Sequence, residues 1–175
     1  MLKHHKTIWL VSIVSIVIAI PMSFYMLYQQ GYRINITPSI PRGIYKVEET
    51  KKFKTNDLVM VCLPNKVAKY ANARGYIFKG SCDNGYSPLI KEIIAVPNDF
   101  VKMNKNGVTV NGKFYNLKQQ LLDSHGRFLE PKTINQKIQG YLLIGYNSPN
   151  SWDSRYFGTV QSKDIQGVMH AIYTL

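Results

Sequence analysis

The stretch Leu89-Ile90-Lys91-Glu92-Ile93-Ile94-Ala95-Val96 places apolar side chains on both faces of an extended chain. A β-strand that is covered on both sides has this pattern, so we predict a buried strand over residues 90–96. A lysine in such a strand is costly, because lowering its pKa from ~10.4 to ~7 takes about 4–5 kcal/mol. Lys91 is therefore either a neutral amine that can act as a base, or a lysine that pairs with Glu92 or extends to the edge of the sheet.

Similar short runs on either side of this stretch predict a mostly β domain. The Asn111-Gly112 pair supplies the two positive φ angles of a type I′ turn and predicts a hairpin over residues 108–115. Helices are predicted over 65–74 and, on a weaker pattern, 118–122, and residues 75–88 and 129–139 have the composition of loops. Strands are predicted over residues 43–47, 57–63, 90–96, 101–103, 141–145 and 167–173. Strands at this spacing favour an antiparallel, partly closed β-domain.

A separate apolar segment precedes this domain. Residues 7–28 form a run of 22 residues without a charge, and as a helix they span ~33 Å, enough for the ~30 Å hydrocarbon core of a bilayer. Lys3 and Lys6 precede the run, which favours a cytoplasmic N-terminus. We therefore predict cytoplasmic residues 1–6, a transmembrane anchor over 7–28 and an exported domain over 31–175. Cleavage of the segment as a signal peptide stays open, although its apolar run is longer than is usual and no clear Ala-x-Ala site follows.

Composition excludes several function classes. The chain has 175 residues and a formal net charge of +12, but its basic residues form no run longer than two. Its aromatic residues are not interleaved with a basic stripe, so no nucleic-acid partner is expected. Two cysteines are too few for a Cys₄ zinc site, and neither a metal nor an organic cofactor is predicted. Cys62 and Cys82 fit either a disulfide in an oxidising compartment or, for Cys62 in its apolar run, a buried free thiol.

Two further stretches carry candidate chemistry. In Asn35-Ile36-Thr37-Pro38-Ser39-Ile40-Pro41-Arg42-Gly43, two prolines flank Ser39 and restrict the residue before each of them. This geometry suits a nucleophile, although a serine between prolines is by itself typical of a loop. Residues 145–158, GYNSPNSWDSRYFG, contain Asp153 and Arg155, which can form an ion pair that holds a loop.

Taken in order after an anchor, these stretches resemble the type I signal peptidases, which are membrane-anchored serine–lysine proteases. Ser39-Ile40-Pro41 matches the nucleophile box, residues 91–99 the lysine box and residues 151–158 the last box. The form Asn35-x-Thr37-x-Ser39-x-Pro41-x-Gly43 resembles the TraF-like branch of conjugative transfer peptidases. The resemblance covers essentially the whole chain, and three ordered boxes are more specific than any one of them. It implies coiled antiparallel β-sheets of the signal peptidase type after one N-terminal transmembrane helix.

The chain departs from the general signal peptidase pattern at four positions. Ile40 stands where Met is usual, Glu92 where Arg is common, and Asn98 where Gly is common. Tyr146 replaces an acidic residue. None of these positions carries the implied chemistry, and together they favour a specialised substrate over a housekeeping secretory role.

The resemblance implies a nucleophile and a base. Ser39 would attack the scissile carbonyl, and the neutral amine of Lys91 would take its proton and later donate it to the leaving amine. The oxyanion donors would be the Ser39 backbone N–H and the Thr37 hydroxyl, which points to the same face if the segment is extended.

The last box would support this pair. Ser151 would orient the Lys91 amine, and Asp153 would hold the loop through Arg155. In the TraF-like branch Asp153 takes either this structural role or a more direct part.

The implied function is a serine endopeptidase of the inner membrane, single-pass, with its catalytic domain in the periplasm. Its substrate would be an exported precursor, most naturally a conjugative pilin, which it could also close into a ring. Its partners would be this precursor, inner membrane lipid and the conjugative transfer apparatus. The alternatives are a general type I signal peptidase that removes leader peptides, and a non-catalytic anchored scaffold of a transfer channel.

Overall fold

The computed structural model describes residues 2–175, except for the side chains of residues 2–8, 10 and 11. The chain divides into two compact units. The boundary lies after Arg33, and the second unit is Ile34–Leu175. The predicted cytoplasmic segment 1–6 begins at Met1, which lies outside the described residues.

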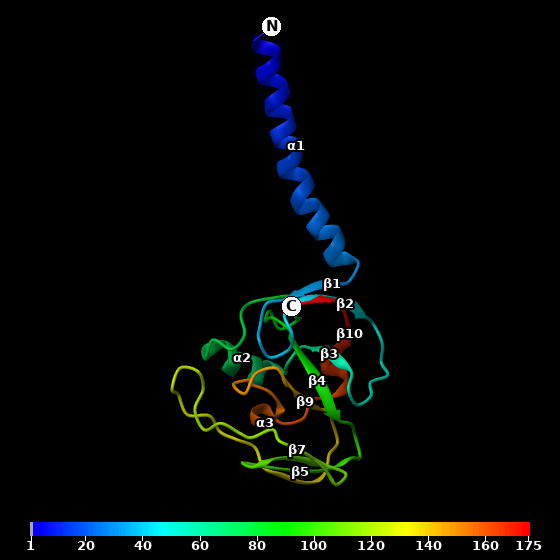
Figure 1. Cartoon of the computed structure of the whole chain (residues 1–175), viewed down its shortest axis with the longest axis vertical. Coiled ribbons are helices and arrows are strands. Elements are labelled where there is room, and N and C mark those ends of the chain that lie inside the picture. Colours follow the sequence, from blue (N-terminus) through cyan, green and yellow to red (C-terminus); the bar gives the residue numbers. More distant parts are fainter. Residues whose placement is uncertain (1) are drawn as a thin grey trace. The chain divides into compact units, whose positions relative to one another are not determined.

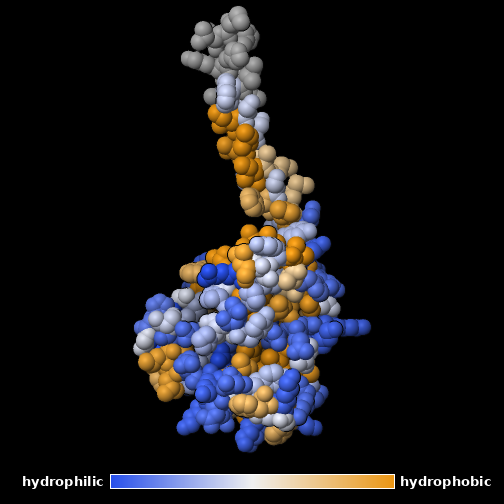
Figure 2. Space-filling model, viewed as in Figure 1, coloured by the Kyte–Doolittle hydropathy of each residue, from blue (hydrophilic) through white to orange (hydrophobic). Residues whose placement is uncertain are grey.

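The first unit ends at Arg33 and consists mainly of the helix α1, Leu2–Gln29, which contains the predicted anchor 7–28. Within it, Ser12–Gln29 is long and apolar enough to cross a membrane, by length and composition. Apolar side chains run along this helix in Figure 2. At its C-terminal end the Arg33 guanidinium donates to the Tyr28 carbonyl oxygen at 2.7 Å and lies 3.8 Å from the centre of the Tyr28 ring. A cation at this end complements the helix dipole.

The second unit is mostly β, as predicted, and contains two antiparallel sheets (Figure 1). The larger sheet has the strand order β1-β2-β10-β3-β4-β9. Its strands are β1 Tyr32–Asn35, β2 Gly43–Glu48, β3 Leu58–Val61, β4 Leu89–Ala95, β9 Leu142–Ile144 and β10 Ile165–Thr174. The predicted strand over 90–96 is β4, an interior strand between β3 and β9, and Ile93, Ile94 and Ala95 near its end are buried.

The smaller sheet has the order β7-β6-β5-β8. Its strands are β5 Phe100–Asn104, β6 Gly107–Val110, β7 Lys113–Tyr115 and β8 Ile134–Lys137. The predicted hairpin is confirmed, because Asn111 and Gly112 both have positive φ angles, 48° and 87°, between the paired strands β6 and β7.

Apolar packing covers β4 from both sides. On one side, Ile93 packs with residues of the helix α2, Asn65–Ala73, which confirms the predicted helix over 65–74. Ile94 and Ala95 belong to a second cluster with Val101 and other inward residues of the smaller sheet. A third cluster consists of Ile40, which follows Ser39 in the chain, and Tyr45, Met60 and Met169. Burying strands on both faces explains why β4 reads as a continuous apolar run.

Two sequence expectations for secondary structure fail, and one strand has no counterpart among the predicted elements. Residues 118–122 are not helical, because backbone groups there bond to distant partners, as when the Gln120 N–H donates to the Tyr156 hydroxyl at 2.8 Å. The predicted loop 129–139 contains β8, and β1 was not predicted. Both are edge strands with mostly partly or fully exposed side chains, so neither has a strongly apolar pattern.

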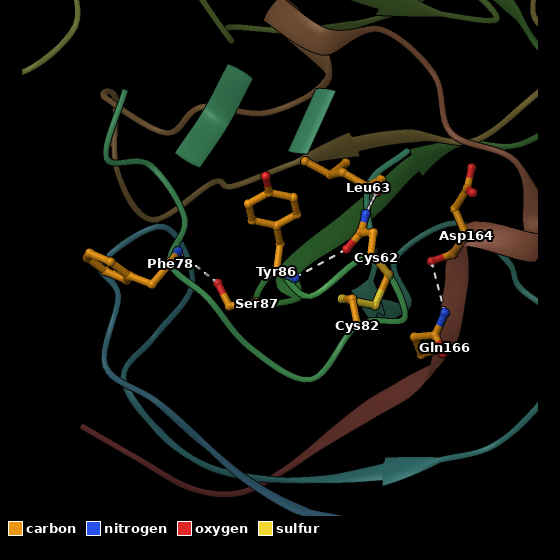
Figure 3. Close-up of a disulfide and its surroundings, with 9 residues drawn as sticks. Cys62, Leu63, Phe78, Cys82, Tyr86, Ser87, Asp164 and Gln166 are labelled. Atoms are coloured by element: carbon orange, nitrogen blue, oxygen red, sulfur yellow. Dashed lines mark hydrogen bonds between the residues drawn. A yellow bond between two sulfur atoms is a disulfide. The ribbon is translucent and has the colours of Figure 1, made fainter. Parts of the chain in front are cut away.

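The cysteines form a disulfide between Cys62 and Cys82, with a Cα–Cα distance of 5.7 Å (Figure 3). It joins the end of β3 to the segment between α2 and β4. Nearby, the Asn84 side-chain amide donates to the Leu63 carbonyl oxygen at 2.8 Å. The segment that leads into β4 is therefore fixed to β3 by a covalent bond and a hydrogen bond.

Candidate active site

Lys91 lies in the interior strand β4, where its backbone pairs with Val59 of β3. The residue is only 2% exposed. Its Nζ atom lies 2.8 Å from Ser39 Oγ and 3.1 Å from Ser151 Oγ. Residues far apart in sequence thus meet at one amine, and the pairing of Lys91 with Glu92 considered from sequence is not what the structure shows.

Burial lowers the pKa of the Lys91 amine from 10.5 to about 8. The negative charge of Asp153 opposes this shift and the positive charge of Arg155 adds to it. Since these two charges act in opposite directions, desolvation remains the dominant effect. A substantial fraction of the amine is therefore neutral near pH 8, as a general base requires.

Ser39 lies in a turn between β1 and β2, and not in an extended segment. The turn is organised by Asn35, the last residue of β1, which is buried. The Asn35 amide nitrogen donates to the carbonyl oxygens of Thr37, Ile40 and Pro41 at 3.0–3.1 Å. Its amide oxygen accepts from the Thr37 N–H and from the Thr37 hydroxyl, the latter at 2.7 Å.

Asn147 contacts the same turn from the loop that follows β9. Its backbone N–H donates to the Ser39 carbonyl oxygen at 3.0 Å. Its side-chain amide donates to the Pro38 carbonyl oxygen, also at 3.0 Å. The loop after β9 therefore holds the turn that contains Ser39 by main chain and side chain.

Asp153 and Arg155 form a buried ion pair just beyond Ser151. Asp153 caps the short helix α3, Ser154–Phe157, by accepting from the Arg155 N–H. Both carboxylate oxygens also accept from the Arg155 guanidinium, from Nε and from an Nη atom, at 2.8 Å each. The Asp153 carboxylate also accepts from the Gly145 N–H at 3.1 Å, and Arg155 also donates to the Ser151 carbonyl oxygen. This pair therefore fixes the backbone of Ser151, whose hydroxyl contacts the amine.

Gly145 directly follows β9 and lies against Ser39 and Ser151. A Cβ atom at this position would stand 2.2 Å from Ser151 Oγ and 2.8 Å from Ser39 Cβ. Any side chain would displace one of them, so the close approach of loop and turn requires glycine here.

The structure brings five of the six predicted site residues into one connected network: Ser39, Lys91, Ser151, Asp153 and Arg155. The sixth, Thr37, lies in the same turn as Ser39, but its hydroxyl donates to Asn35 and the segment is not extended, so its role as an oxyanion donor stays a prediction.

Sequence reasoning assigned no role to Asn35, Gly145 or Asn147. Asn35 and Asn147 could have drawn notice as asparagines beside two of the quoted boxes. Nothing local indicates that Asn147 contacts residues 108 and 109 positions earlier in the chain.

The arrangement can perform acyl transfer. It contains a hydroxyl and an amine of lowered pKa within hydrogen-bond distance, and a second, buried hydroxyl, that of Ser151, in contact with the amine. Among the described residues no cluster of three or more His, Cys, Asp or Glu side chains could hold a metal ion.

Comparison with known proteins places the chain among peptidases. The family model described as signal peptidase, peptidase S26, matches residues 6–174. The conjugal transfer protein TraF of Agrobacterium fabrum is 33% identical over 147 residues, which are 82% of this chain and 83% of that protein. The plasmid transfer protein TraF of Escherichia coli is 34% identical over 152 residues, 84% of this chain and 85% of that protein. A crystal structure of a signal peptidase I from Enterococcus faecalis is 23% identical, with a TM-score of 0.41, and the match covers 68% of this chain and 97% of that one.

Proposed function

The chain belongs to the signal peptidase family, peptidase S26, and from this membership we propose that it is a membrane-anchored serine endopeptidase that processes an exported precursor, a conjugative pilin. The observation that carries the catalytic proposal is the 2.8 Å distance between Lys91 Nζ and Ser39 Oγ at a buried amine of lowered pKa. The similarity to TraF proteins of conjugal and plasmid transfer supports the pilin as substrate.

In this mechanism the neutral Lys91 amine accepts the Ser39 hydroxyl proton while Oγ attacks the scissile carbonyl. The tetrahedral oxyanion is stabilised by the Ser39 backbone N–H, with the Thr37 hydroxyl as a second donor if it leaves Asn35. The Lys91 ammonium then donates its proton to the leaving amine, and an acyl-Ser39 ester remains. Water or another amine attacks this ester, with Lys91 again as the base.

Asp153 takes the supporting role in this proposal. Both of its oxygens are occupied by Arg155, so neither is free to receive a proton from the substrate. Ser151 orients the Lys91 amine, and Asp153 with Arg155 positions Ser151.

The proposal also places the domain over 31–175 in the periplasm, with α1 as a single inner-membrane anchor. The disulfide between Cys62 and Cys82 supports this orientation, because disulfides persist in oxidising compartments and are rare in the cytoplasm. The basic residues Lys3 and Lys6 before the anchor support it as well.

The test is processing of a conjugative pilin precursor that is co-expressed with the full-length chain, with a general secretory precursor as comparison. Ser39→Ala and Lys91→Ala should each abolish processing, whereas the matched controls Ser148→Ala and Lys102→Ala should retain it. Normal processing in either dyad variant, at equal protein levels, contradicts the proposal. Processing of the secretory precursor instead of the pilin favours the general signal peptidase, and no processing of either favours the anchored scaffold.

We further propose that the acyl-Ser39 ester is resolved by the pilin's own N-terminal amine, which would close the pilin into a ring. An amine held near the ester has an effective concentration that can reach ~10⁵ M or more. This step depends on the resemblance to the TraF-like branch. The intact mass of the mature pilin tests it, because the ring is one water lighter than the linear product of the same residues. A linear mass together with an essential Ser39 identifies a plain hydrolase.

A further inference from the structure

The turn that contains Ser39 has an unusual pattern of hydrogen bonds. The carbonyl oxygens of all five residues from 37 to 41 accept a hydrogen bond from a group outside the run. Three accept from the Asn35 side chain and two from Asn147. In contrast, the N–H groups of Ser39 and Ile40 donate to no acceptor within the described residues.

The bond to the Pro38 carbonyl fixes the direction of one of these free donors. The peptide between Pro38 and Ser39 is trans, so its C=O and N–H point to opposite sides of a rigid plane. The Asn147 side-chain amide holds the C=O at 3.0 Å, and the Ser39 N–H must therefore point away from Asn147. The adjacent bond from the Asn147 N–H to the Ser39 carbonyl fixes the peptide that follows.

Asn147 also connects the nucleophile turn to the amine. It lies in the same loop as Gly145 and Ser151, and Gly145 packs directly against both Ser39 and Ser151. Ser151 in turn contacts Lys91 Nζ at 3.1 Å. One loop thus holds both the peptide that precedes the nucleophile and the hydroxyl that orients the base.

We propose that Asn147 is a positioning residue that aims the Ser39 backbone N–H into the oxyanion hole. It does so by holding the Pro38 carbonyl from the opposite side of the peptide plane. Asn147 bonds to main-chain carbonyls and, within the described residues, not to Ser39 Oγ or Lys91 Nζ, so the effect of its side chain on the reaction passes through this one peptide group. The inference rests on the proposed peptidase function of Ser39 and Lys91.

The test compares Asn147→Ala with the matched variant Asn150→Ala. Asn150 is an exposed asparagine of the same loop whose side chain makes no hydrogen bond within the described residues. The probes are a peptide ester that ends in alanine and its thionoester counterpart, with the full-length chain in detergent micelles. A thionoester places sulfur in the oxyanion hole, where it accepts hydrogen bonds poorly, so the ratio of the two rates reports on the N–H donor.

We expect Asn147→Ala to lower kcat for the oxygen ester by between about tenfold and the ~10²–10³-fold found for complete loss of an oxyanion donor, because the Ser39 N–H is misdirected and not removed. KM and the thionoester rate should change little, so the rate ratio should fall towards one. Asn150→Ala should leave both rates at the wild-type level. Asn147→Leu, which keeps the shape but not the donor, should repeat the alanine result.

Two results overturn the inference. An equal fall of both ester rates in Asn147→Ala would mean that Asn147 only maintains the loop. Wild-type rates in both Asn147 variants would mean that it has no role in the reaction. Failure of the proposed function is recognised separately, because the wild-type chain would then show no ester cleavage that Ser39→Ala removes.

Discussion

At the scale of single residues, stability and chemistry oppose each other at Lys91. Its pKa is about 8 in the folded chain and 10.5 in an exposed lysine. The unfolded state therefore binds more protons between these two values, and stability rises with pH across that interval. Below pH 8 the folded state carries the full cost of the buried amine, about 3 kcal/mol at ~1.4 kcal/mol per pKa unit. The fold tolerates this cost at a position where an apolar residue would fit.

We therefore predict that Lys91→Met stabilises the protein at pH 7 by about 1–3 kcal/mol while it abolishes activity. The variant should also lose the rise in stability between pH 8 and pH 10.5. Urea unfolding in detergent, measured at several pH values, checks both. Lys102→Met, at an exposed lysine, is the control and should change neither. A destabilised Lys91→Met would show that the contacts of the Lys91 amine stabilise the fold, and would contradict the prediction that the buried amine lowers its stability.

Gly145 is a second residue at which one atom decides the geometry. Gly145→Ala would place a Cβ atom 2.2 Å from Ser151 Oγ and 2.8 Å from Ser39 Cβ. We predict a loss of kcat/KM of about 100-fold or more, because misplacement by about 1 Å has effects of this size. Precursor cleavage kinetics measure it, and Tyr146→Ala, at the exposed neighbouring residue, should remain active. Activity within a few-fold of wild type in Gly145→Ala would mean that the reaction does not require this close approach of Ser39 and Ser151.

At the scale of elements, the site combines a rigid strand with two loops. Lys91 is carried by an interior strand, whereas Ser39 and Ser151 are carried by a turn and a loop. The turn is held by Asn35 and the loop by the pair of Asp153 and Arg155. Precision in this site therefore comes from buried polar side chains that fix main-chain groups.

The disulfide is the covalent element of this framework. Joining Cys62 to Cys82 across 20 residues should stabilise the fold by about 3 kcal/mol. We predict that the double variant Cys62→Ser/Cys82→Ser loses about this much stability while its processing rate stays within a few-fold of wild type. Urea unfolding of oxidised wild type, reduced wild type and the double variant checks it. If reduction leaves wild-type stability unchanged, the bond contributes nothing to the fold.

At the scale of the whole molecule, an apolar helix and a domain of the signal peptidase family lie on one chain. In the proposed orientation the domain faces the periplasm, so protease added outside spheroplasts should digest it while a cytoplasmic marker protein stays intact. Immunoblotting of the domain measures the digestion. Protection in spheroplasts together with cleavage in inverted vesicles would reverse the orientation.

Local sequence determined much of this protein. The uncharged run over 7–28 predicts α1, the Asn111-Gly112 pair predicts its hairpin, and the apolar run around Lys91 predicts an interior strand. These predictions succeed because each depends on a local property of the chain: helix length, turn conformation or side-chain alternation. The three ordered boxes also identified the family, because an ordered set of residue types can be recognised in the sequence without knowing which residues are in contact.

Only the tertiary structure decided how these parts meet. The edge strands β1 and β8 lack an apolar pattern, and their pairing depends on neighbours distant in sequence. The hydroxyl of Thr37 donates to Asn35 because the segment turns, which alternation in an extended chain could not reveal. The disulfide and the contacts of Asn147 likewise join residues whose proximity no local rule specifies. The pKa of Lys91 depends on the same packing, because desolvation arises only when other elements cover the amine.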